Sequence, residues 1–370
     1  MICRSGPRLL RPPAFGSMNK TMGDTPLYVA ASKEDRKKME DLLKIIGRLA
    51  VVAGLLAVAL LGINFGAAAQ SYPDQPIIMI VPFAAGGPVD VMARTVAERM
   101  SRYIGQPIVI ENVLGAGGTT GTTKAMRAAP DGYTIVAGNM GTHAAAVALY
   151  PNLIYDPVKD FEPIGLLAST SVMVLARKDL PPQNLREFVR YLQDNAAKVN
   201  MAHAGIGSSS HVTCLLFNQG IGVRPTMIPY SGTGPAMNAL VAGEVDYMCD
   251  VITNAAPRVQ AGTIKAYAIA MPKRSPVLPD VPTAEEAGMP SFDPTSWVGV
   301  FAPKHTERGI LDRLSGALDK SLDDSVVRKR LTDLGNDVPD SAQRGAQPLG
   351  DLVRSETARW SAVLSKAAPQ

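Results

Sequence analysis

The segment IIMIVPFAAGGPVDVMARTVAERMSRYI (residues 77–104) contains a short apolar strand, a glycine-rich loop and an amphipathic helix. The loop, residues 83–88, joins the strand to the helix. The apolar positions of the helical part share one face: Val89, Ala93, Val96, Ala97, Met100 and Ile104. Strand, loop and helix in this order form the repeating unit of an α/β fold.

The same unit recurs along the chain, and each apolar segment is followed by a loop rich in glycine or hydroxyl residues. Further strands are predicted at 107–111, 133–137, 164–176, 199–202, 226–229, 245–249, 265–271 and 297–302. Helical periodicity covers 119–129 and 185–197 and dominates from Glu307 onward. We therefore predict an α/β fold with mostly parallel sheets. In such sheets, ligands bind beyond the carboxyl ends of the strands. Six loops rich in glycine or hydroxyl residues lie there, which is more than one compact sheet requires. We therefore predict two sheets that face each other across a ligand cleft.

Residues 1–69 have the features of a secretory leader. An apolar run, Leu49–Ile63, follows Lys44 and Arg48 and leads into Ala67-Ala68-Ala69-Gln70. A basic flank, an apolar run and small residues at the end are typical of a cleaved signal peptide. The run is short for a membrane span, which needs about 20 apolar residues, but an uncleaved anchor is the alternative. We predict a periplasmic protein whose true start is Met39.

Charge and composition restrict the class of protein. The 370 residues are 46% hydrophobic and 19% charged, which is typical of a globular protein of two domains. The net charge of +4 arises in the leader, because residues 70–370 contain 27 Lys or Arg and 28 Asp or Glu. The body lacks the basic surplus of nucleic-acid-binding proteins, so we predict no nucleic-acid partner.

Two cysteines, Cys214 and Cys249, follow the leader. Two thiols in an exported protein can pair. Two separate buried thiols are the alternative, because neither cysteine lies among turn residues. The sequence leaves both alternatives open.

A collinear set of short motifs extends from Tyr72 to the carboxyl terminus. In order they are Tyr72-Pro73, PFAAGGPVD (82–90), EN (111–112), GAGG (115–118), APDGYT (129–134), YDP (155–157), G-x-GS-x-SH (205–211), PY-x-G (229–232), RSP (274–276), PDVPT (279–283) and SW-x-G (296–299). The set resembles the solute receptors of tripartite tricarboxylate transporters, often called the Bug family. One such motif is weak evidence, whereas the whole set in this order is specific.

The resemblance implies a type II periplasmic binding protein fold, in which two α/β domains with mostly parallel sheets enclose a ligand cleft. A discontinuous domain would hold residues 71–173 and 270–370, and an inserted domain would hold 174–269. The implied ligand is a small carboxylate solute, and the implied partners are membrane transporter subunits or a sensor protein. We expect the chain to be a monomer and to need no cofactor.

The loops contain the groups that an anion site needs. Helix N-termini present unpaired N–H groups and a positive dipole end, and residues 83–90, 112–123, 139–143, 204–211, 230–236 and 250–254 contain no Lys or Arg. A carboxylate would therefore be bound by N–H groups, hydroxyls and water. From the loops and the family motifs we predict these ligand-binding residues: Phe83, Ala84, Gly86, Gly87, Asp90, Gly118, Thr119, Asn139, Gly141, Thr142, Gly207, Ser208, His211, Tyr230, Gly232, Asp250 and Trp297.

Several of these residues also have a purely structural explanation. Ser208 and Asp250 are of the types that cap helices, and Asp90 in a first turn complements the helix dipole. Tyr230 and Trp297 can be core aromatics. His211 is a lone histidine without clustered carboxylates or cysteines, so we predict no metal site.

Two enzyme classes are alternatives to a binding protein. The glycines at 115, 117, 118 and 121 suggest a nucleotide fingerprint, but the next strand ends in Ala137-Gly138-Asn139 without the required acidic residue. A hydrolase needs a G-x-S-x-G elbow, which residues 205–211 lack. We predict no catalytic residues and no enzyme activity.

The sequence departs from the family pattern at three places. Val113-Leu114 replaces a common basic-Pro pair, Met140 replaces a small hydroxyl residue, and Val298 replaces an aromatic residue. These changes make the expected pocket more apolar. They favour the hypothesis of a less polar monocarboxylate ligand, such as an aromatic acid.

Overall fold

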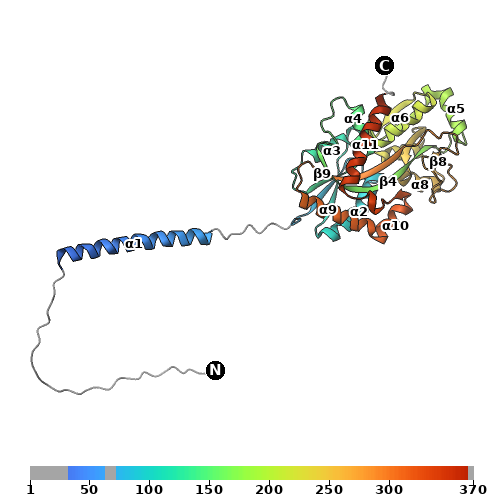
Figure 1. Cartoon of the computed structure of the whole chain (residues 1–370). Helices are drawn as coiled ribbons and strands as arrows, with labels where there is room; N and C mark the ends of the chain where they lie inside the picture. Colours follow the sequence, from blue (N-terminus) through green and yellow to red (C-terminus); the bar gives the residue numbers. More distant parts are fainter. Residues whose placement is uncertain (1–31, 63–71, 366–370) are drawn as a thin grey trace, which may run out of the picture. The chain divides into compact units, whose positions relative to one another are not determined.

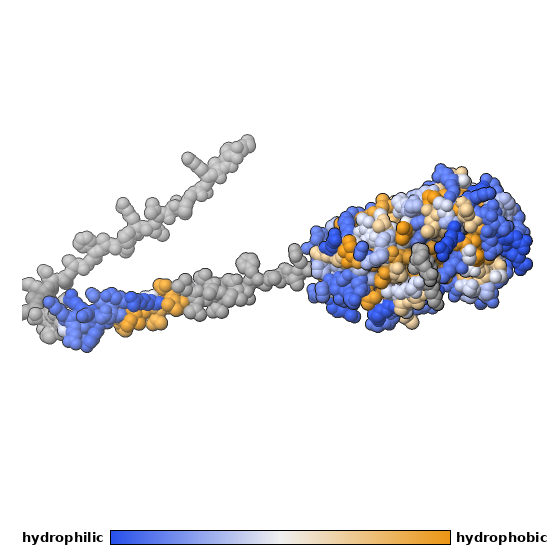
Figure 2. Space-filling view, turned by 90° about the horizontal axis from the view of Figure 1, so that it is seen from above, coloured by the Kyte–Doolittle hydropathy of each residue, from blue (hydrophilic) through white to orange (hydrophobic). Residues whose placement is uncertain are grey.

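The computed structural model describes residues 32–62 and 72–365, which belong to two separate units (Figure 1). In the first unit a single helix, α1 (Lys33–Gly62), has exposed charged residues in its first half and exposed Leu49, Val51 and Val52 later. Figure 2 shows this change from a hydrophilic to a hydrophobic surface along the helix. Among the described residues, no helix combines the length and hydropathy that a membrane crossing requires. The predicted cleavage region, residues 67–70, lies outside the described residues.

The second unit alternates strands and helices. Its strands are β1 (Ile77–Val81), β2 (Ile108–Asn112), β3 (Thr134–Asn139), β4 (Phe161–Arg177), β5 (Asn200–His203), β6 (Thr226–Pro229), β7 (Tyr247–Val251), β8 (Ile264–Ile269), β9 (Thr295–Pro303) and β10 (Asn336–Asp337). Its α-helices are α2 (Pro88–Ile104), α3 (Thr119–Met126), α4 (Ala146–Leu149), α5 (Leu185–Asn195), α6 (Ser209–Ile221), α7 (Thr233–Ala242), α8 (Ile252–Gln260), α9 (Arg308–Asp323), α10 (Ser325–Asp333) and α11 (Ala346–Ser365). Single turns lie at η1 (Ala116–Gly118), η2 (Gly141–Ala145), η3 (Ala196–Lys198) and η4 (Ser341–Gln343).

The strands form a sheet in the order β2-β1-β3-β9-β4-β7-β5-β6, with β8 and β10 also paired to β4. β1 runs parallel to β2 and β3, and β5 runs parallel to β6 and β7. The long central strand β4 pairs with β9 along 161–171 and with β7 and β8 along 172–177, always antiparallel (Figure 1). We call β2-β1-β3-β9 and their helices the first half, and β7-β5-β6-β8 and theirs the second half. β4 joins the two halves.

Helices cover both faces of the sheet, and the residues of β1, β3, β4, β7 and β9 are mostly buried. In the first half, Ile77, Met79 and Val81 of β1 pack with α2 and α9 in one core cluster. In the second half, Phe188 of α5 and Phe217 of α6 stack with their rings nearly parallel, at a centroid distance of 6.2 Å. The predicted α/β arrangement of strands and helices is confirmed. The predicted division at 173/174 falls inside β4, and it stays a prediction.

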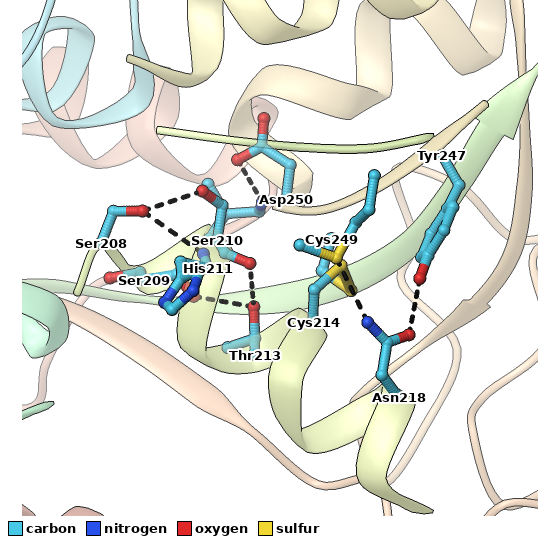
Figure 3. Close-up of a disulfide and its surroundings, with 12 residues drawn as sticks. Ser208, Ser209, Ser210, His211, Thr213, Cys214, Asn218, Tyr247, Cys249 and Asp250 are labelled. Atoms are coloured by element: carbon cyan, nitrogen blue, oxygen red, sulfur yellow. Dashed lines mark hydrogen bonds between the residues drawn. A yellow bond between two sulfur atoms is a disulfide. The ribbon is translucent and has the colours of Figure 1, made fainter. Parts of the chain in front are cut away.

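A disulfide links two elements of the second half (Figure 3). It joins Cys214 of α6 to Cys249 of β7, two residues that are 35 positions apart and fully buried. The sequence had left pairing and separate thiols open, and the structure pairs them. The bond lies beside Asp250, the next residue of β7, and Cys214 follows Ser210 of the first turn of α6 by four residues.

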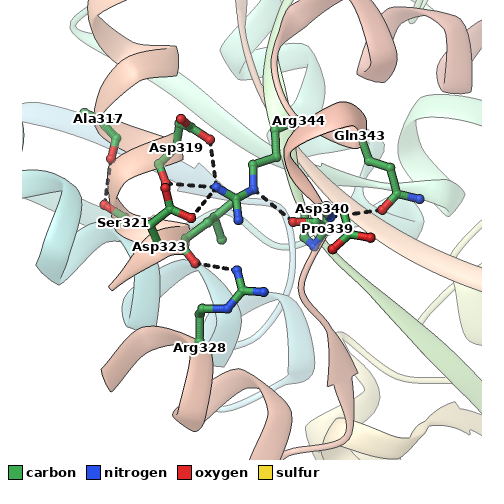
Figure 4. A network of polar contacts seen from close by, with 10 residues as sticks. Ala317, Asp319, Ser321, Asp323, Arg328, Pro339, Asp340, Gln343 and Arg344 are labelled. Carbon is green, nitrogen blue, oxygen red and sulfur yellow. Dashed lines mark hydrogen bonds and ion pairs between the residues drawn. The ribbon is translucent and has the colours of Figure 1, made fainter. Parts of the chain in front are cut away.

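The segment between α10 and α11 is tied to α9 through Arg344 (Figure 4). The guanidinium Nη1 lies 2.9 Å from Asp319 Oδ1 and 2.8 Å from Asp323 Oδ1, and Nε donates to the carbonyl oxygen of Pro339 at 2.9 Å. Only 7% of the Arg344 side chain is exposed. The anchored segment includes β10, which pairs with β4 at Thr170, so the second unit's C-terminal part supports the junction of the two halves.

Candidate functional site

A cavity lies where the two halves face each other, and we call it the inner cavity. Both halves and β4 contribute its lining: Phe83, Gly87, Pro88, Val89, Met92, Asn139, Thr170, Val172, Ala204, Ser208, Ser209, Ser210, Thr213, Thr233, Asp250, Val251, Ser296 and Val298. It leaves about 40 Å³ for the centres of water-sized molecules. One ordered water takes about 10–15 Å³ on that scale, so the cavity accommodates roughly three or four. This size favours a compact ligand.

Helix N-termini from both halves meet at the inner cavity. The lining includes Pro88 of the first turn of α2, Ser209 of α6 and Thr233 of α7, and Val251 directly before α8. The first N–H groups of a helix have no intrahelical acceptor, and the dipole gives this end a partial positive charge. Four such ends at one cavity favour a negatively charged ligand.

The lining contains no Lys or Arg, and its single ionisable residue is Asp250. Burial raises the pKa of the Asp250 carboxyl to about 7, although hydrogen bonds from Asn254 and from the N–H of Val251 oppose the rise. Asn254 Nδ2 lies 2.5 Å from Asp250 Oδ2, and Val251 N lies 2.8 Å from Oδ1. The protonated carboxyl can donate a hydrogen bond into the cavity, whereas the ionised carboxylate repels an anion.

A polar network positions Phe83, one wall of the inner cavity. Asn112 Nδ2 donates to the carbonyl oxygen of Phe83 at 3.0 Å and to Asp90 Oδ1 at 2.9 Å. Asp90 also accepts from Arg94 Nε and from the N–H of Gly86, each at 2.9 Å. Burial raises the pKa of Asp90, but these three donors outweigh it and hold the pKa below its usual value. Asp90 thus stabilises the loop and does not line the cavity.

The serines at the start of α6 have structural partners as well as cavity positions. Ser208 is the N-cap, accepting from the N–H of His211 at 3.3 Å, and Ser210 Oγ accepts from the N–H of Ala204 at 2.9 Å. Ser209 Oγ accepts from the N–H of Gly141 at 3.2 Å. His211 Nδ1 accepts from the N–H of Gly207 at 3.3 Å, and burial lowers the pKa of His211 to about 3. His211 therefore supports the loop as a neutral ring.

The structure brings together five of the predicted ligand-binding residues in the inner cavity: Phe83, Gly87, Asn139, Ser208 and Asp250. Gly118 and Tyr230 line a neighbouring outer pocket. The others lie outside both linings: Ala84, Gly86, Asp90, Thr119, Gly141, Thr142, Gly207, His211, Gly232 and Trp297. Side chains of a strand alternate between its two faces. Ser296 and Val298 of β9 line the cavity, so Trp297 between them faces the other way and is buried among core residues. The ligand contacts of these residues remain predictions.

Several lining residues were not among the predicted ligand-binding positions. They are Pro88, Val89, Met92, Thr170, Val172, Ala204, Ser209, Ser210, Thr213, Thr233, Val251, Ser296 and Val298. Ser209 and Thr233 carried a signal, since each is a hydroxyl residue at a predicted loop-to-helix junction. Thr170 carried a weaker one, as a polar residue within a long apolar strand.

Within residues 32–62 and 72–365, no group of three or more His, Cys, Asp or Glu side chains is placed to hold a metal ion. The groups that the site presents to a ligand are N–H groups, hydroxyls and Asp250. Such donors bind and orient an anion.

Comparisons with known proteins bear on the family and the fold of the chain. Residues 92–368 match the family described as "Tripartite tricarboxylate transporter family receptor". A relative from Agrobacterium vitis, the UPF0065 protein in the TAR-I ttuE-ttuC' intergenic region, is 40% identical over 302 residues, which cover 81% of this chain and 86% of that protein.

Two solved structures share the fold. MatC from Rhodopseudomonas palustris with bound malate has a TM-score of 0.78 at 51% identity, covering 79% of this chain and 99% of its own. The periplasmic binding protein BugD has a TM-score of 0.77 at 41% identity, covering 80% and 98%. The predicted periplasmic binding protein fold is therefore confirmed.

Proposed function

The chain belongs to the receptor family of the tripartite tricarboxylate transporters, and from this premise we propose that it captures a small dicarboxylate in the inner cavity. The family resemblance predicted from the motifs is confirmed. The observation that supports the ligand class is the convergence of four helix N-termini on a cavity with nine polar lining residues and no cation. Carboxylate oxygens accept hydrogen bonds from such N–H and hydroxyl groups.

A dicarboxylate is favoured over the less polar monocarboxylate of the earlier hypothesis. MatC, at 51% identity, was solved with malate. Half of the 18 lining residues are polar, and they come from both halves, so a ligand with a carboxylate at each end can use both sets. Of the three departures from the family pattern, only Val298 reaches the cavity, whereas Met140 is buried elsewhere and Leu114 is exposed.

We further propose that the protein works in the periplasm after its leader is removed, and that it delivers the solute to membrane subunits of a transporter. The family description, which names a receptor, supports this proposal. The basic and apolar pattern of residues 44–63 supports export. Delivery to a sensor protein would use the same cavity, and a test with transporter subunits distinguishes the two partners. That the protein is no enzyme stays a prediction.

A thermal-unfolding screen of residues 70–370 tests the ligand class. We expect malate or another four- to six-carbon dicarboxylate to raise the midpoint by several degrees, since a ligand at about 1,000 times its dissociation constant adds about 4 kcal/mol. Aromatic monocarboxylates, amino acids and neutral sugars serve as comparison ligands. A shift by monocarboxylates alone would restore the earlier hypothesis, and a shift by sugars alone would contradict the anion site.

Asp250 predicts the pH dependence of binding. With a pKa of about 7, Asp250 is protonated below neutral pH and ionised above it, so a dicarboxylate should bind more weakly as the pH rises from 6 to 8.5. The dissociation constant should increase up to about tenfold per pH unit above 7. Asp250→Asn should flatten the profile, as titration calorimetry at several pH values would show. A wild-type affinity that rises with pH would contradict the assignment.

The raised pKa of Asp250 also affects the stability of the ligand-free protein. The pKa of Asp250 is raised on folding from an unfolded value of 3.8, so its contribution to stability is complete below about pH 4 and is lost as the pH rises through 7. Asp250→Asn should therefore stabilise the ligand-free protein at pH 7 to 8 relative to wild type. Urea unfolding at pH 4.5 and pH 8 checks the sign.

A further inference from the structure

Two glycine-containing loops from opposite halves meet beside the inner cavity. Residues 115–118 precede α3 in the first half, and residues 205–207 precede α6 in the second. Both loops line the outer pocket, which shares Ala204 with the inner cavity. A Cβ atom added at Gly117 would lie 1.8 Å from the carbonyl oxygen of Ile206, so the two backbones are in direct contact. Gly117 and Ile206 both line the outer pocket, which adjoins the inner cavity at Ala204.

Tyr150 bridges the same two loops. It follows α4 in the first half, and its hydroxyl oxygen lies 2.6 Å from the carbonyl oxygen of Ile206 and 2.8 Å from that of Ala116. The hydroxyl has one proton to donate. Ala116 O already accepts from Thr119 Oγ1 at 2.9 Å, and the distance to Ile206 is the shorter, so donation to Ile206 is favoured. This hydrogen bond crosses from the first half to the second.

The ring of Tyr150 packs against the second half as closely as its hydroxyl does. A Cβ atom added at Gly207 would lie 2.7 Å from Cε2 of the ring, so the ring rests on the bare backbone of that residue. The side chain is half-buried, and burial raises the pKa of Tyr150, which keeps the hydroxyl a donor at neutral pH. Ring and hydroxyl together hold residues 206 and 207 against the loop that contains Ala116.

We infer that Tyr150 is a positioning residue that holds the two halves closed over a bound solute and so sets how fast the solute leaves. The inference rests on the proposed function, because a solute must occupy the inner cavity. The bond from Gly141 N to Ser209 Oγ also joins the halves, but it ends on a lining residue of the inner cavity. Tyr150 lines only the outer pocket, so its substitution leaves the lining residues of the inner cavity unchanged.

The test compares Tyr150→Phe with Tyr103→Phe, using malate as the probe. Tyr103 is an α2 residue with 44% exposure, so its variant is a matched control for loss of a tyrosine hydroxyl. Losing one net hydrogen bond should increase the dissociation rate of malate about three- to tenfold in Tyr150→Phe, with a smaller change in the association rate. Tyr103→Phe should match wild type. Equal dissociation rates in all three proteins would overturn the inference.

A second readout separates this inference from the proposed function. If wild type binds no dicarboxylate, the proposed function fails, and amide hydrogen exchange of the ligand-free proteins decides about Tyr150. The reporters are the N–H groups of Gly118 and Ser208, which bond within the two loops to Gly115 and Gly205. They should exchange several-fold faster in Tyr150→Phe than in wild type or Tyr103→Phe. Equal exchange in all three would overturn the inference on this readout.

Discussion

Gly117→Ala is expected to abolish solute capture, with the dissociation constant for a dicarboxylate rising by more than about 100-fold. The new Cβ atom would lie 1.8 Å from Ile206 O and 2.8 Å from Ile206 C, both in the other half of the sheet. Backbone atoms cannot be displaced as the end of a flexible side chain can. The loops must therefore separate, which moves the two halves apart beside the inner cavity. A 100-fold loss corresponds to about 2.7 kcal/mol.

Gly262→Ala is the matched control for this prediction. Gly117 and Gly262 both have a φ of 62°, so alanine is strained to a similar extent at each position. Gly262 has no atom within 4 Å of the added Cβ, and it lies outside the inner cavity and the outer pocket. Titration calorimetry should give wild-type affinity for Gly262→Ala and no measurable affinity for Gly117→Ala. Similar affinities in both variants would show that the loops need not touch during capture.

The double variant Cys214→Ala/Cys249→Ala is expected to lose about 4 kcal/mol of unfolding free energy. The disulfide closes a loop of 35 residues. Without it the unfolded chain gains conformational entropy, and this gain accounts for the expected loss of about 4 kcal/mol. Alanine avoids adding a polar group at two positions that are fully buried. Urea unfolding without ligand measures the loss.

Reducing agent provides the control for the disulfide prediction. Wild-type protein unfolded and refolded with dithiothreitol should fall to the stability of the double variant, and the variant itself should not respond to dithiothreitol. A variant as stable as oxidised wild type would mean that Cys214 and Cys249 do not pair in the folded protein. The bond also fixes α6 next to Asp250, so a weaker affinity for solute should accompany the loss of stability.

The elements of the sheet were predictable where apolar patterns are strong. The segment 226–229 was predicted as a strand and is β6, and 164–176 lies within β4. β10 was not predicted, since Asn336 and Asp337 have no apolar pattern, and they pair with β4 at Thr170 and Ser169. The antiparallel pairing of β9 with β3 and β4 also escaped prediction. Pairing between strands so far apart in sequence depends on tertiary packing rather than on local pattern.

The chemical groups of the site were easier to predict than the residues that line it. Glycine and hydroxyl residues before helices indicated an anion site without lysine or arginine, and the lining has that composition. The family motif predicts Trp297 as a ligand-binding residue, and of the three residues Ser296 to Val298 the lining of the inner cavity includes Ser296 and Val298. Which side chains of a strand face the cavity depends on the register of its pairing, and a single sequence does not reveal that register. Thr170 reaches the cavity because β4 crosses between the halves, which is likewise a property of the assembled sheet.

The absence of a cation from the inner-cavity lining also bears on how such receptors diverge. Peptide N–H groups at helix starts belong to the main chain, and no substitution other than proline removes them. Mutations can therefore reshape the lining one side chain at a time while attraction for carboxylates persists. Positions such as Met92 and Val298 can change the length or polarity of the preferred solute in single steps. The preferred solute of such a receptor can thus change during evolution while every intermediate form still binds a carboxylate.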